Sequence, residues 1–370
     1  MNDFKKNLEN YIFQHGFDVV GYSSPSVDKK AKEEYLSFLN KNYHGEMKWL
    51  ERHFETKINP KRIWNNVKSI IVIGQNYAPK KNPLINNLSF NKANISVYAQ
   101  NEDYHEVIKI KLKKIQSWLL NKYYLDSKIF VDSSPIFEKY FAKKANLGWQ
   151  GKHTNIVSKE YGSWLFLAEI FLPVEIKSPK SKIIDGCGSC AKCIEVCPTK
   201  ALVDENKIDA RKCISYLTIE NKGPIPMSLR KKIGNKVYGC DDCLSICPWN
   251  KFAKKHNEMK FEIIKKLELP SLKKMISFDE YDYRTYFSGT PLRRLGYIRF
   301  LRNVLIAIGN TEKKCFSRHV IKKLDFEDEI VKSIAVWSLY NINKKAFRIE
   351  KQKRYFKEKS SLVKKEWDRF

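Results

Sequence analysis

Two short runs of cysteines constrain this sequence more than any other feature. The first run, over residues 187–198, has the spacing C-x2-C-x2-C-x3-C-P, and the second, over 240–248, has C-x2-C-x3-C-P. Cys213 lies between them, so eight of the nine cysteines fall between residues 187 and 247. The first run matches the pattern by which bacterial ferredoxins bind [4Fe–4S] clusters. Eight thiolates suffice for two such clusters, and bound metal would hold together a segment that has few apolar runs.

The order of the cysteines also predicts which of them share a cluster. In two-cluster ferredoxins, the cysteine before the proline binds the other cluster. We therefore expect a first cluster on Cys187, Cys190, Cys193 and Cys247. We expect the second cluster on Cys197, Cys213, Cys240 and Cys243. Structural zinc is the alternative, because C-x2-C pairs also form tetrahedral zinc sites, but zinc sites rarely add a third cysteine and a trailing C-P in both runs.

Charge and hydropathy narrow the class of protein further. The chain has 69 Lys and Arg against 41 Asp and Glu, a formal net charge of +28, which favours a polyanionic partner such as nucleic acid. A generally lysine-rich composition without clustering is the alternative. The N-terminus lacks the apolar core of a signal peptide, and Glu169 and Pro173 interrupt the most apolar stretch, so we expect a cytosolic protein with no membrane segment. Disulfides are not expected there, and Cys315 is predicted to be a buried thiol.

Hydrophobic periodicity predicts an α+β protein of several domains. Helical and strand patterns alternate over residues 1–180, which we interpret as an α/β domain. Residues 181–255 form the predicted ferredoxin-like domain, and 256–370 a helical region with two apolar-striped helices of the HEAT type. The predicted elements of the first domain are helices over 3–16, 103–123 and 136–149, strands over 17–23, 67–79 and 127–131, and a hairpin across 161–162.

Two residues of the first domain are candidates for chemistry. Asp132 follows a predicted strand, where open α/β sheets place ligands, and it could either deliver a proton or cap the next helix. His153 could be a turn residue, a ligand or a phosphate contact. Gly148 and Gly151 beside it suggest close backbone approach to a ligand. No G-x-G-x-x-G or P-loop motif is present, so the motifs identify no dinucleotide or nucleotide site.

Several longer stretches together resemble the epoxyqueuosine reductase family, in the same order and over nearly the whole chain. They are VDSSPIFEKYFAKKANLGWQGKHTNIV, YGSWLFLAEI, CGSCAKCIEVCPTKAL, IDARKCISYLTIENKGPIP, IGNKVYGCDDCLSICPWN and PLRRLGYIRFLRNVLIAIGN. The resemblance implies a cobalamin-dependent iron–sulfur enzyme that removes the epoxide oxygen of epoxyqueuosine at the wobble position of tRNA, the last step of queuosine synthesis. It also implies a cobalamin-binding domain related to that of reductive dehalogenases, two [4Fe–4S] clusters, and HEAT-like helices, here an abbreviated array, that help to hold tRNA.

The resemblance also implies roles for individual residues. Asp132 is the implied proton donor to the opened epoxide. Implied cobalamin contacts are Lys57, Asp132, Ile156, Ser215 and Asp241. Implied tRNA-facing residues are Lys222, Arg293, Arg294, Arg299 and Arg302. An electron donor is required that the sequence does not identify, and we expect a monomer, since the enzyme must grip a large tRNA.

Three other functions are compatible with parts of the sequence. A corrinoid reductive dehalogenase relative would share the cofactors, but such proteins usually carry a twin-arginine export signal, which is absent here. A non-catalytic electron carrier with a basic docking face would not bind a corrinoid. A structural zinc protein that binds nucleic acid would hold zinc in place of iron.

Overall fold

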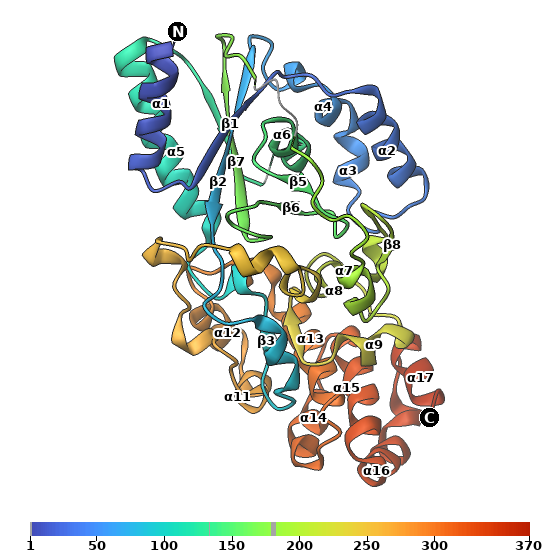
Figure 1. Cartoon of the computed structure of the whole chain (residues 1–370). Coiled ribbons are helices and arrows are strands. Elements are labelled where there is room, and N and C mark those ends of the chain that lie inside the picture. The colour runs from blue at the N-terminus through green and yellow to red at the C-terminus, as the bar shows by residue number, and fades with distance from the viewer. Residues whose placement is uncertain (1, 133, 179–182) are drawn as a thin grey trace.

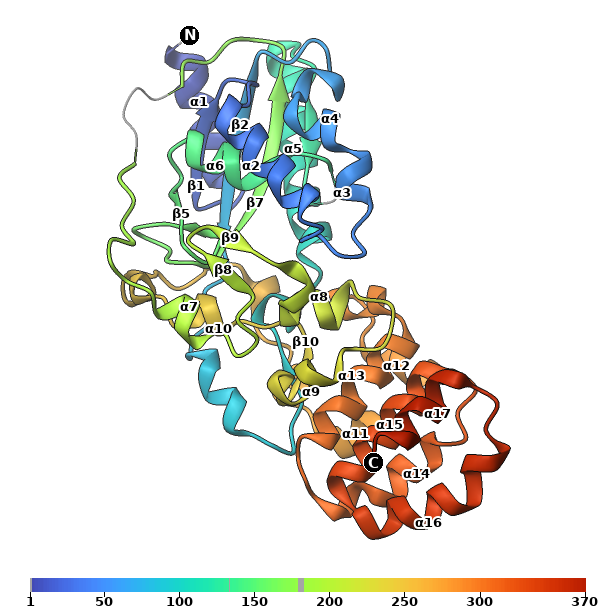
Figure 2. The same cartoon turned by 90° about the vertical axis from the view of Figure 1, so that its right-hand side faces the viewer.

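The computed structural model describes residues 2–132, 134–178 and 183–370 (Figures 1 and 2). Its first part is built on one four-stranded sheet with the order β1-β2-β7-β4. The strands are β1 (Val19–Ser23), β2 (Ser69–Asn76), β4 (Lys128–Phe130) and β7 (Leu165–Leu172). Every ladder of this sheet is antiparallel. The predicted mixture of helices and strands is confirmed, and because its ladders are antiparallel, the rule that places ligands at the ends of parallel strands does not explain the position of Asp132.

Helices cover both faces of the sheet, and the alternation of side chains along β2 explains how. Ile71 and Ile73 pack toward α1 (Asn2–Gln14) and α5 (Tyr104–Tyr123), which lie together on one side in Figure 1. Ile70 and Val72 point to the opposite face, because successive side chains of a strand alternate. That face is covered by α6 (Glu138–Lys144), with three further helices beyond it: α2 (Lys29–Asn40), α3 (Trp49–Arg52) and α4 (Phe54–Ile58).

Local signals predicted most of these elements. Helix α5 begins where expected, with the Asp103 carboxylate accepting from the His105 backbone N–H as an N-cap. The predicted hairpin across residues 161–162 is wrong. Only an isolated bridge joins Ser158 and Gly162, because β7 pairs along its length with β2 and also with β4. The short strands β5 (Trp149–Gln150) and β6 (Ile156–Val157) pair with each other instead.

The cysteine-bearing segment consists of short elements between the sheet and the C-terminal helices. One strand of its small sheet comes from the first third of the chain, since β3 (Asn94–Ile95) pairs in parallel with β10 (Lys236–Tyr238). The other elements of this segment are α7 (Lys192–Val196), β8 (Leu202–Asp204), β9 (Lys207–Ile208), α8 (Ile214–Ile219), α9 (Met227–Ile233) and α10 (Asp242–Ser245). Of these, α7 and α10 lie side by side, toward the left in Figure 2.

The C-terminal region is helical, as predicted. Its helices are α11 (Leu272–Ser277), α12 (Glu280–Tyr286), α13 (Tyr297–Gly309), α14 (Ser317–Lys323), α15 (Glu329–Ile342), α16 (Lys344–Arg354) and α17 (Ser361–Asp368). Helices α13 and α15 pack closely, since a Cβ on Gly309 would lie 2.3 Å from the Trp337 ring. Cys315 is exposed, so the prediction of a buried thiol is wrong. Within the described ranges, no helix has the length and apolar character to cross a bilayer.

Candidate active site and cluster-binding cysteines

The eight cysteines of the central segment fall into two spatial groups. The pKa of Cys193 is raised to about 11, first by burial and then by its neighbours Cys187, Cys247 and Cys190. Helix α7, which carries Cys193, lies against α10, whose chain leads on to Cys247. These four cysteines are the ones predicted for the first cluster.

The second group combines Cys197 with cysteines that come later in the chain. Burial, followed by Cys213 and Cys197, raises the pKa of the Cys243 thiol well above its usual value, and Cys243 in turn contributes to the raised pKa of Cys240. All of these thiols are free, so each group offers four sulfur ligands, the number that a [4Fe–4S] cluster requires. Cys213 also stands directly before α8 as its N-cap residue, so that helix fixes its position.

Two cysteine sulfurs accept hydrogen bonds. Trp149 Nε1 donates to Cys187 Sγ over 3.4 Å, and the Ala201 backbone N–H donates to Cys197 Sγ over 3.3 Å. Hydrogen bonds to the ligating sulfurs are one of the means by which proteins set the potential of an iron–sulfur cluster. Each group therefore has a donor from the surrounding protein already in place.

Asp132 does not cap a helix. Helix α6 begins only at Glu138, and Asp132 instead presents its carboxylate to Tyr104 and His105 on α5. The Tyr104 hydroxyl donates to Asp132 Oδ2, and His105 Nε2 lies 3.1 Å from the same oxygen. Burial raises the pKa of Asp132, but the bonds from His105 and Tyr104 outweigh it, so the net shift is downward. The backbone φ of 53° at Asp132 is an uncommon conformation for a residue other than glycine.

His105 links Asp132 to a second carboxylate. Its Nδ1 lies 2.8 Å from Asp103 Oδ1, and Asp103 forms an ion pair with Arg294. Burial lowers the pKa of His105, yet the bonds to Asp103 and Asp132 outweigh burial and raise it to about 9. The imidazole is therefore protonated at neutral pH. The sequence analysis missed Tyr104 and His105, although they directly follow the recognised N-cap of the helix.

A buried acidic cluster lies behind Asp132. The Asp132 backbone N–H donates to Glu138 Oε1 over 2.7 Å, and the pKa of Glu138 is raised by burial and then by Asp132. Glu169, in the middle of β7, is fully buried, and neither of its carboxylate oxygens has a hydrogen-bond partner among the described residues. Burial, followed by Glu138 and Asp132, raises the pKa of Glu169 well above the usual value for a glutamate.

Lys57 completes this cluster from α4. Its Nζ donates to the Ile136 carbonyl over 2.8 Å, which holds the chain between Asp132 and α6. Burial lowers the pKa of Lys57, whereas the charges of Glu138 and Glu169 raise it; burial prevails, so the net shift is downward. Lys57 therefore lies within electrostatic range of Asp132, and its ammonium binds the protein backbone; its implied contact with cobalamin stays a prediction.

Lys139 of α6 links the surroundings of Asp132 electrostatically with the second cysteine group. Its side chain is exposed, and that of Asp132 is 54% exposed. Loss of hydration lowers the pKa of Lys139, and the negative charges of Glu138, Asp132, Cys243 and Cys213 oppose this shift. Lys139 therefore lies within electrostatic range of both the Asp132 carboxylate and the second cysteine group.

The other implied cobalamin contacts have varied environments. Ser215 is half-buried in the first turn of α8, and Ile156 is buried in β6. Asp241 is buried, and its carboxylate accepts from Ser96 Oγ at 2.5 Å and from the Val97 N–H at 2.9 Å. The pKa of Asp241 is raised to about 6 by burial, although both hydrogen bonds lower it. Its carboxylate therefore ties the second cluster loop to the chain that leads from β3 toward α5.

His153 and its neighbouring glycines serve the fold. The imidazole is buried, its Nε2 lies 3.2 Å from Ser163 Oγ, and its Nδ1 accepts from the Asn155 N–H. Burial, followed by Lys139, lowers its pKa to about 4, so it is neutral. A Cβ on Gly148 would lie 2.2 Å from the Val157 carbonyl oxygen, so this glycine allows contact between backbones. The close approach predicted there is to β6 and not to a ligand.

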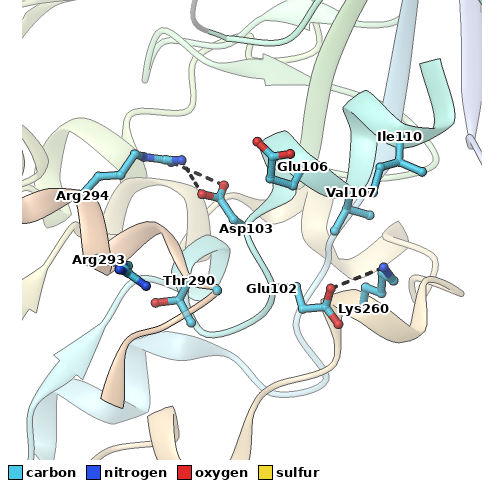
Figure 3. Close-up of a pocket in the computed structure, with 10 residues that line it drawn as sticks. Glu102, Asp103, Glu106, Val107, Ile110, Lys260, Thr290, Arg293 and Arg294 are labelled. Atoms are coloured by element: carbon cyan, nitrogen blue, oxygen red, sulfur yellow. Dashed lines mark hydrogen bonds and ion pairs between the residues drawn. The ribbon is translucent and has the colours of Figure 1, made fainter. Parts of the chain in front are cut away.

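The predicted tRNA-facing residues divide into exposed and buried ones. Lys222, Arg293 and Arg294 are exposed. Arg293 and Arg294 belong to a 3-10 helix, η8 (Pro291–Leu295), and line a cleft of about 450 Å³ together with Asp103 and the start of α5 (Figure 3). The cleft therefore adjoins the chain of contacts from Arg294 through Asp103 and His105 to Asp132.

Arg302 faces the interior, so the prediction that it faces tRNA is wrong. Its guanidinium is fully buried and donates to the backbone carbonyls of Leu217, Asn221 and Gly223 over 2.6–2.8 Å. Arg299 is half-buried and donates to the Ile219 carbonyl over 2.6 Å. Both arginines of α13 thus hold the end of α8 and the loop that carries Lys222. The hydrophobic stripe of α13 did not reveal which of its arginines face inward.

Comparison with known proteins agrees with this site. A family model described as epoxyqueuosine reductase QueG, DUF1730, matches residues 57–133, and one described as a 4Fe-4S double cluster binding domain matches residues 186–250. The epoxyqueuosine reductase of Salmonella typhimurium is 39% identical over 316 residues, covering 84% of this chain and 81% of its own. That of Vibrio cholerae is 39% identical over 308 residues, covering 82% of each chain.

Solved structures are similar over almost the full length. An epoxyqueuosine reductase with an epoxyqueuosine-modified tRNA-Tyr stem loop superposes with a TM-score of 0.91 at 27% identity, covering 99% of this chain and 97% of its own. The Bacillus subtilis enzyme, in a structure with an aspartate catalytic loop swung out of the active site, gives a TM-score of 0.89 at 25% identity, covering 99% and 98%. With relatives this similar over this length, the chain belongs to the epoxyqueuosine reductase family.

Proposed function

We propose that this protein reduces epoxyqueuosine to queuosine at the wobble position of tRNA, with cobalamin bound between Asp132 and the second cysteine group. Removal of the epoxide oxygen as water consumes two electrons and two protons. When bound, cobalamin supplies a low-valent cobalt that can reduce an epoxide carbon, and two [4Fe–4S] clusters supply single electrons. The observation that carries the proposal is the Asp132 carboxylate, held by Tyr104 and His105.

The role of the residues around Asp132 is to hold and replace a proton. The protonated His105 and the Tyr104 hydroxyl both point at Asp132 Oδ2, so a proton given to the substrate oxygen from this site can be restored through short hydrogen bonds. Because burial raises the pKa of Tyr104, the hydroxyl remains a donor. Asp103, itself paired with Arg294, keeps His105 oriented and charged.

The remaining residues support cofactor and substrate. Lys57, Ile156, Ser215 and Asp241 are proposed to shape the cobalamin site, partly through backbone groups. Lys222, Arg293 and Arg294 are proposed to contact tRNA phosphates, since they are exposed and basic. The proposed organisation is a cobalamin domain over 1–180, a two-cluster domain over 181–255 and a HEAT-like tRNA-binding region over 256–370. We further propose a cytosolic monomer.

An anaerobic single-turnover assay tests the function. Protein reconstituted with both clusters is mixed with tRNA that carries epoxyqueuosine, with and without cobalamin and with dithionite as reductant, and the digested nucleosides are analysed by mass spectrometry. Loss of one oxygen only when protein and cobalamin are both present is the expected result. No conversion by protein that demonstrably contains both clusters and corrinoid would favour an electron carrier instead.

A further inference from the structure

An aromatic path leads from the first cysteine group to the surface. Trp149, which donates to Cys187 Sγ, is 1% exposed and contacts Trp249 edge-to-face with ring centroids 4.9 Å apart. Trp249 in turn lies 5.8 Å from Phe252, whose side chain is 64% exposed. Trp249 Nε1 also donates to the Gly186 carbonyl over 3.0 Å, next to Cys187. The surroundings of the first cluster thus reach solvent through one continuous group of aromatic rings.

The surface around Phe252 combines apolar side chains with free positive charge. Ile184 is 84% exposed, which is unusual for a large apolar side chain. Lys192, at the start of α7, and Lys251, in the 3-10 helix η5 (Pro248–Phe252), are exposed, and neither forms an ion pair within the described part of the chain. Both lysines stand within a few residues of cysteines of the first group. Of the two acids nearby in the chain, Asp185 accepts the Cys187 N–H at 2.8 Å, and Glu195 on α7 is exposed.

This surface lies away from the other functional parts of the molecule. Cys213 and Cys243 of the second group act on the pKa of Lys139 near Asp132, whereas Cys187 of the first group lies beside Trp149. In Figure 2, α7 and α10 lie to the left of α8, α12 and α13. A protein bound beside α7 and α10 would therefore approach from a different side than tRNA bound at Arg293 and Arg294, between α12 and α13.

We propose that Ile184, Lys192, Lys251 and Phe252 form the docking surface for an acidic, low-potential electron-carrier protein. Its apolar centre and basic surroundings complement a carrier whose own cofactor is ringed by carboxylates, and electrostatic attraction of this kind speeds encounter. In each encounter the carrier loses one electron and the first cluster gains it, so two encounters supply the two electrons that the proposed epoxide reduction consumes. The inference rests on the two clusters of the proposed function, and it requires neither cobalamin nor tRNA.

The test uses cluster-loaded protein under anaerobic conditions and two reductants, flavodoxin hydroquinone and dithionite. Bleaching of the cluster absorbance is followed by stopped flow, and flavodoxin binding is measured by calorimetry. For the double variant Lys251→Glu, Phe252→Ser, we expect flavodoxin-driven bleaching to slow at least ten-fold and binding to weaken in parallel, with the dithionite rate within two-fold of wild type. The wild-type flavodoxin rate should fall with added salt, and that of the variant should not.

The matched control is Lys365→Glu, which makes the same charge change at an exposed position of α17. It should leave both rates unchanged. A flavodoxin rate that is equal in wild type and double variant, or equally lowered by Lys365→Glu, would overturn the docking surface. If the double variant slows dithionite as well, its cluster is damaged, and Lys192→Glu on α7 then decides by the same two criteria. Failure of the proposed function would be seen in the single-turnover assay instead: the clusters would be fully reduced, but the epoxyqueuosine of the tRNA would not be converted.

Discussion

His105 is held between two carboxylates, with Nδ1 2.8 Å from Asp103 Oδ1 and Nε2 3.1 Å from Asp132 Oδ2. This arrangement keeps the imidazole charged and places a positive group beside the oxygen of Asp132 that also accepts from Tyr104. Because Arg294 pairs with Asp103, an exposed arginine beside the cleft is connected to Asp132 by three consecutive polar contacts.

Replacing Asp132 with asparagine is expected to abolish most turnover. The amide cannot pass a proton from the charged His105 to the opened epoxide, and general acid catalysis typically contributes about 10²–10⁴-fold. Cluster absorbance and corrinoid binding should be retained, since the carboxylate binds neither group through its charge alone. Single-turnover rates and the two spectra are the measurements. An undiminished rate would remove Asp132 from the mechanism.

The charge of His105 gives the fold a defined dependence on pH. Its pKa in the folded protein, about 9, lies above the value of about 6.5 expected for an unfolded chain. The stabilisation is therefore fully present below about pH 6.5 and is lost as the pH rises through about 9. Comparing Tm of wild type and His105→Gln from pH 6 to pH 9.5, we expect the difference to shrink with rising pH. A constant difference would contradict a raised pKa.

Glu169→Gln should stabilise the protein at alkaline pH. The pKa of Glu169 is higher in the folded than in the unfolded chain. At a pH above the usual pKa of a glutamate, folding must therefore bind a proton, and the free-energy cost of this uptake increases with pH. Glutamine keeps the shape without this cost. The free energy of unfolding of the variant should exceed that of wild type at pH 8 and approach it near pH 4.5. A less stable variant at pH 8 would instead indicate an ionised Glu169 paired with Lys57.

Arg302→Met should destabilise the protein and also weaken tRNA binding, although Arg302 does not reach the surface. Three backbone carbonyls would lose a charged donor, at a cost of about 3–5 kcal/mol for breaking a buried charged contact. The loop of Lys222 should then loosen. Tm and tRNA affinity at low temperature are the measurements. Arg293→Met, at an exposed position on η8, is the control and should leave Tm unchanged. Unaltered Tm for Arg302→Met would contradict the buried position.

Cys213→Ser tests the division of the cysteines into two groups. The variant should lose the cluster shared with Cys197 and retain the one on Cys193, so the iron content should fall from about eight to about four per chain. Chemical iron analysis and electron paramagnetic resonance after reduction distinguish the two clusters. Preferential loss of the cluster on Cys193 would overturn the assignment.

The sequence predicted those structural elements whose signals are local in the chain, and it failed for features that depend on contacts between residues far apart in the sequence. Elements with local signals, such as the buried strand β2 and helix α5 with its cap at Asp103, were predicted. The assignment of the cysteines to two clusters stays a prediction of the ferredoxin rule, and the electrostatic neighbours of Cys193 and Cys243 are compatible with it.

Non-local relations were not predictable. Strand periodicity is the same for parallel and antiparallel ladders, so the direction of β7 between β2 and β4 was not apparent. Tyr104 and His105 read as ordinary helix residues, because only the fold brings Asp132 beside them. The inward orientation of Arg302 depends on carbonyls some eighty positions earlier in the chain, which its own helix does not reveal.

The parallel pairing of β3 with β10 limits how this enzyme can be divided. Asn94 and Lys236 are neighbours in that ladder, so part of the first third of the chain is built into the region that holds the clusters. A gene fragment that ends at codon 180 would leave β3 without its partner strand, and a fragment that begins there would lack one strand of its sheet. On the ribosome, this small sheet cannot close until residue 238 has emerged, so the first third of the chain cannot complete its fold before the cysteine-bearing segment has been made.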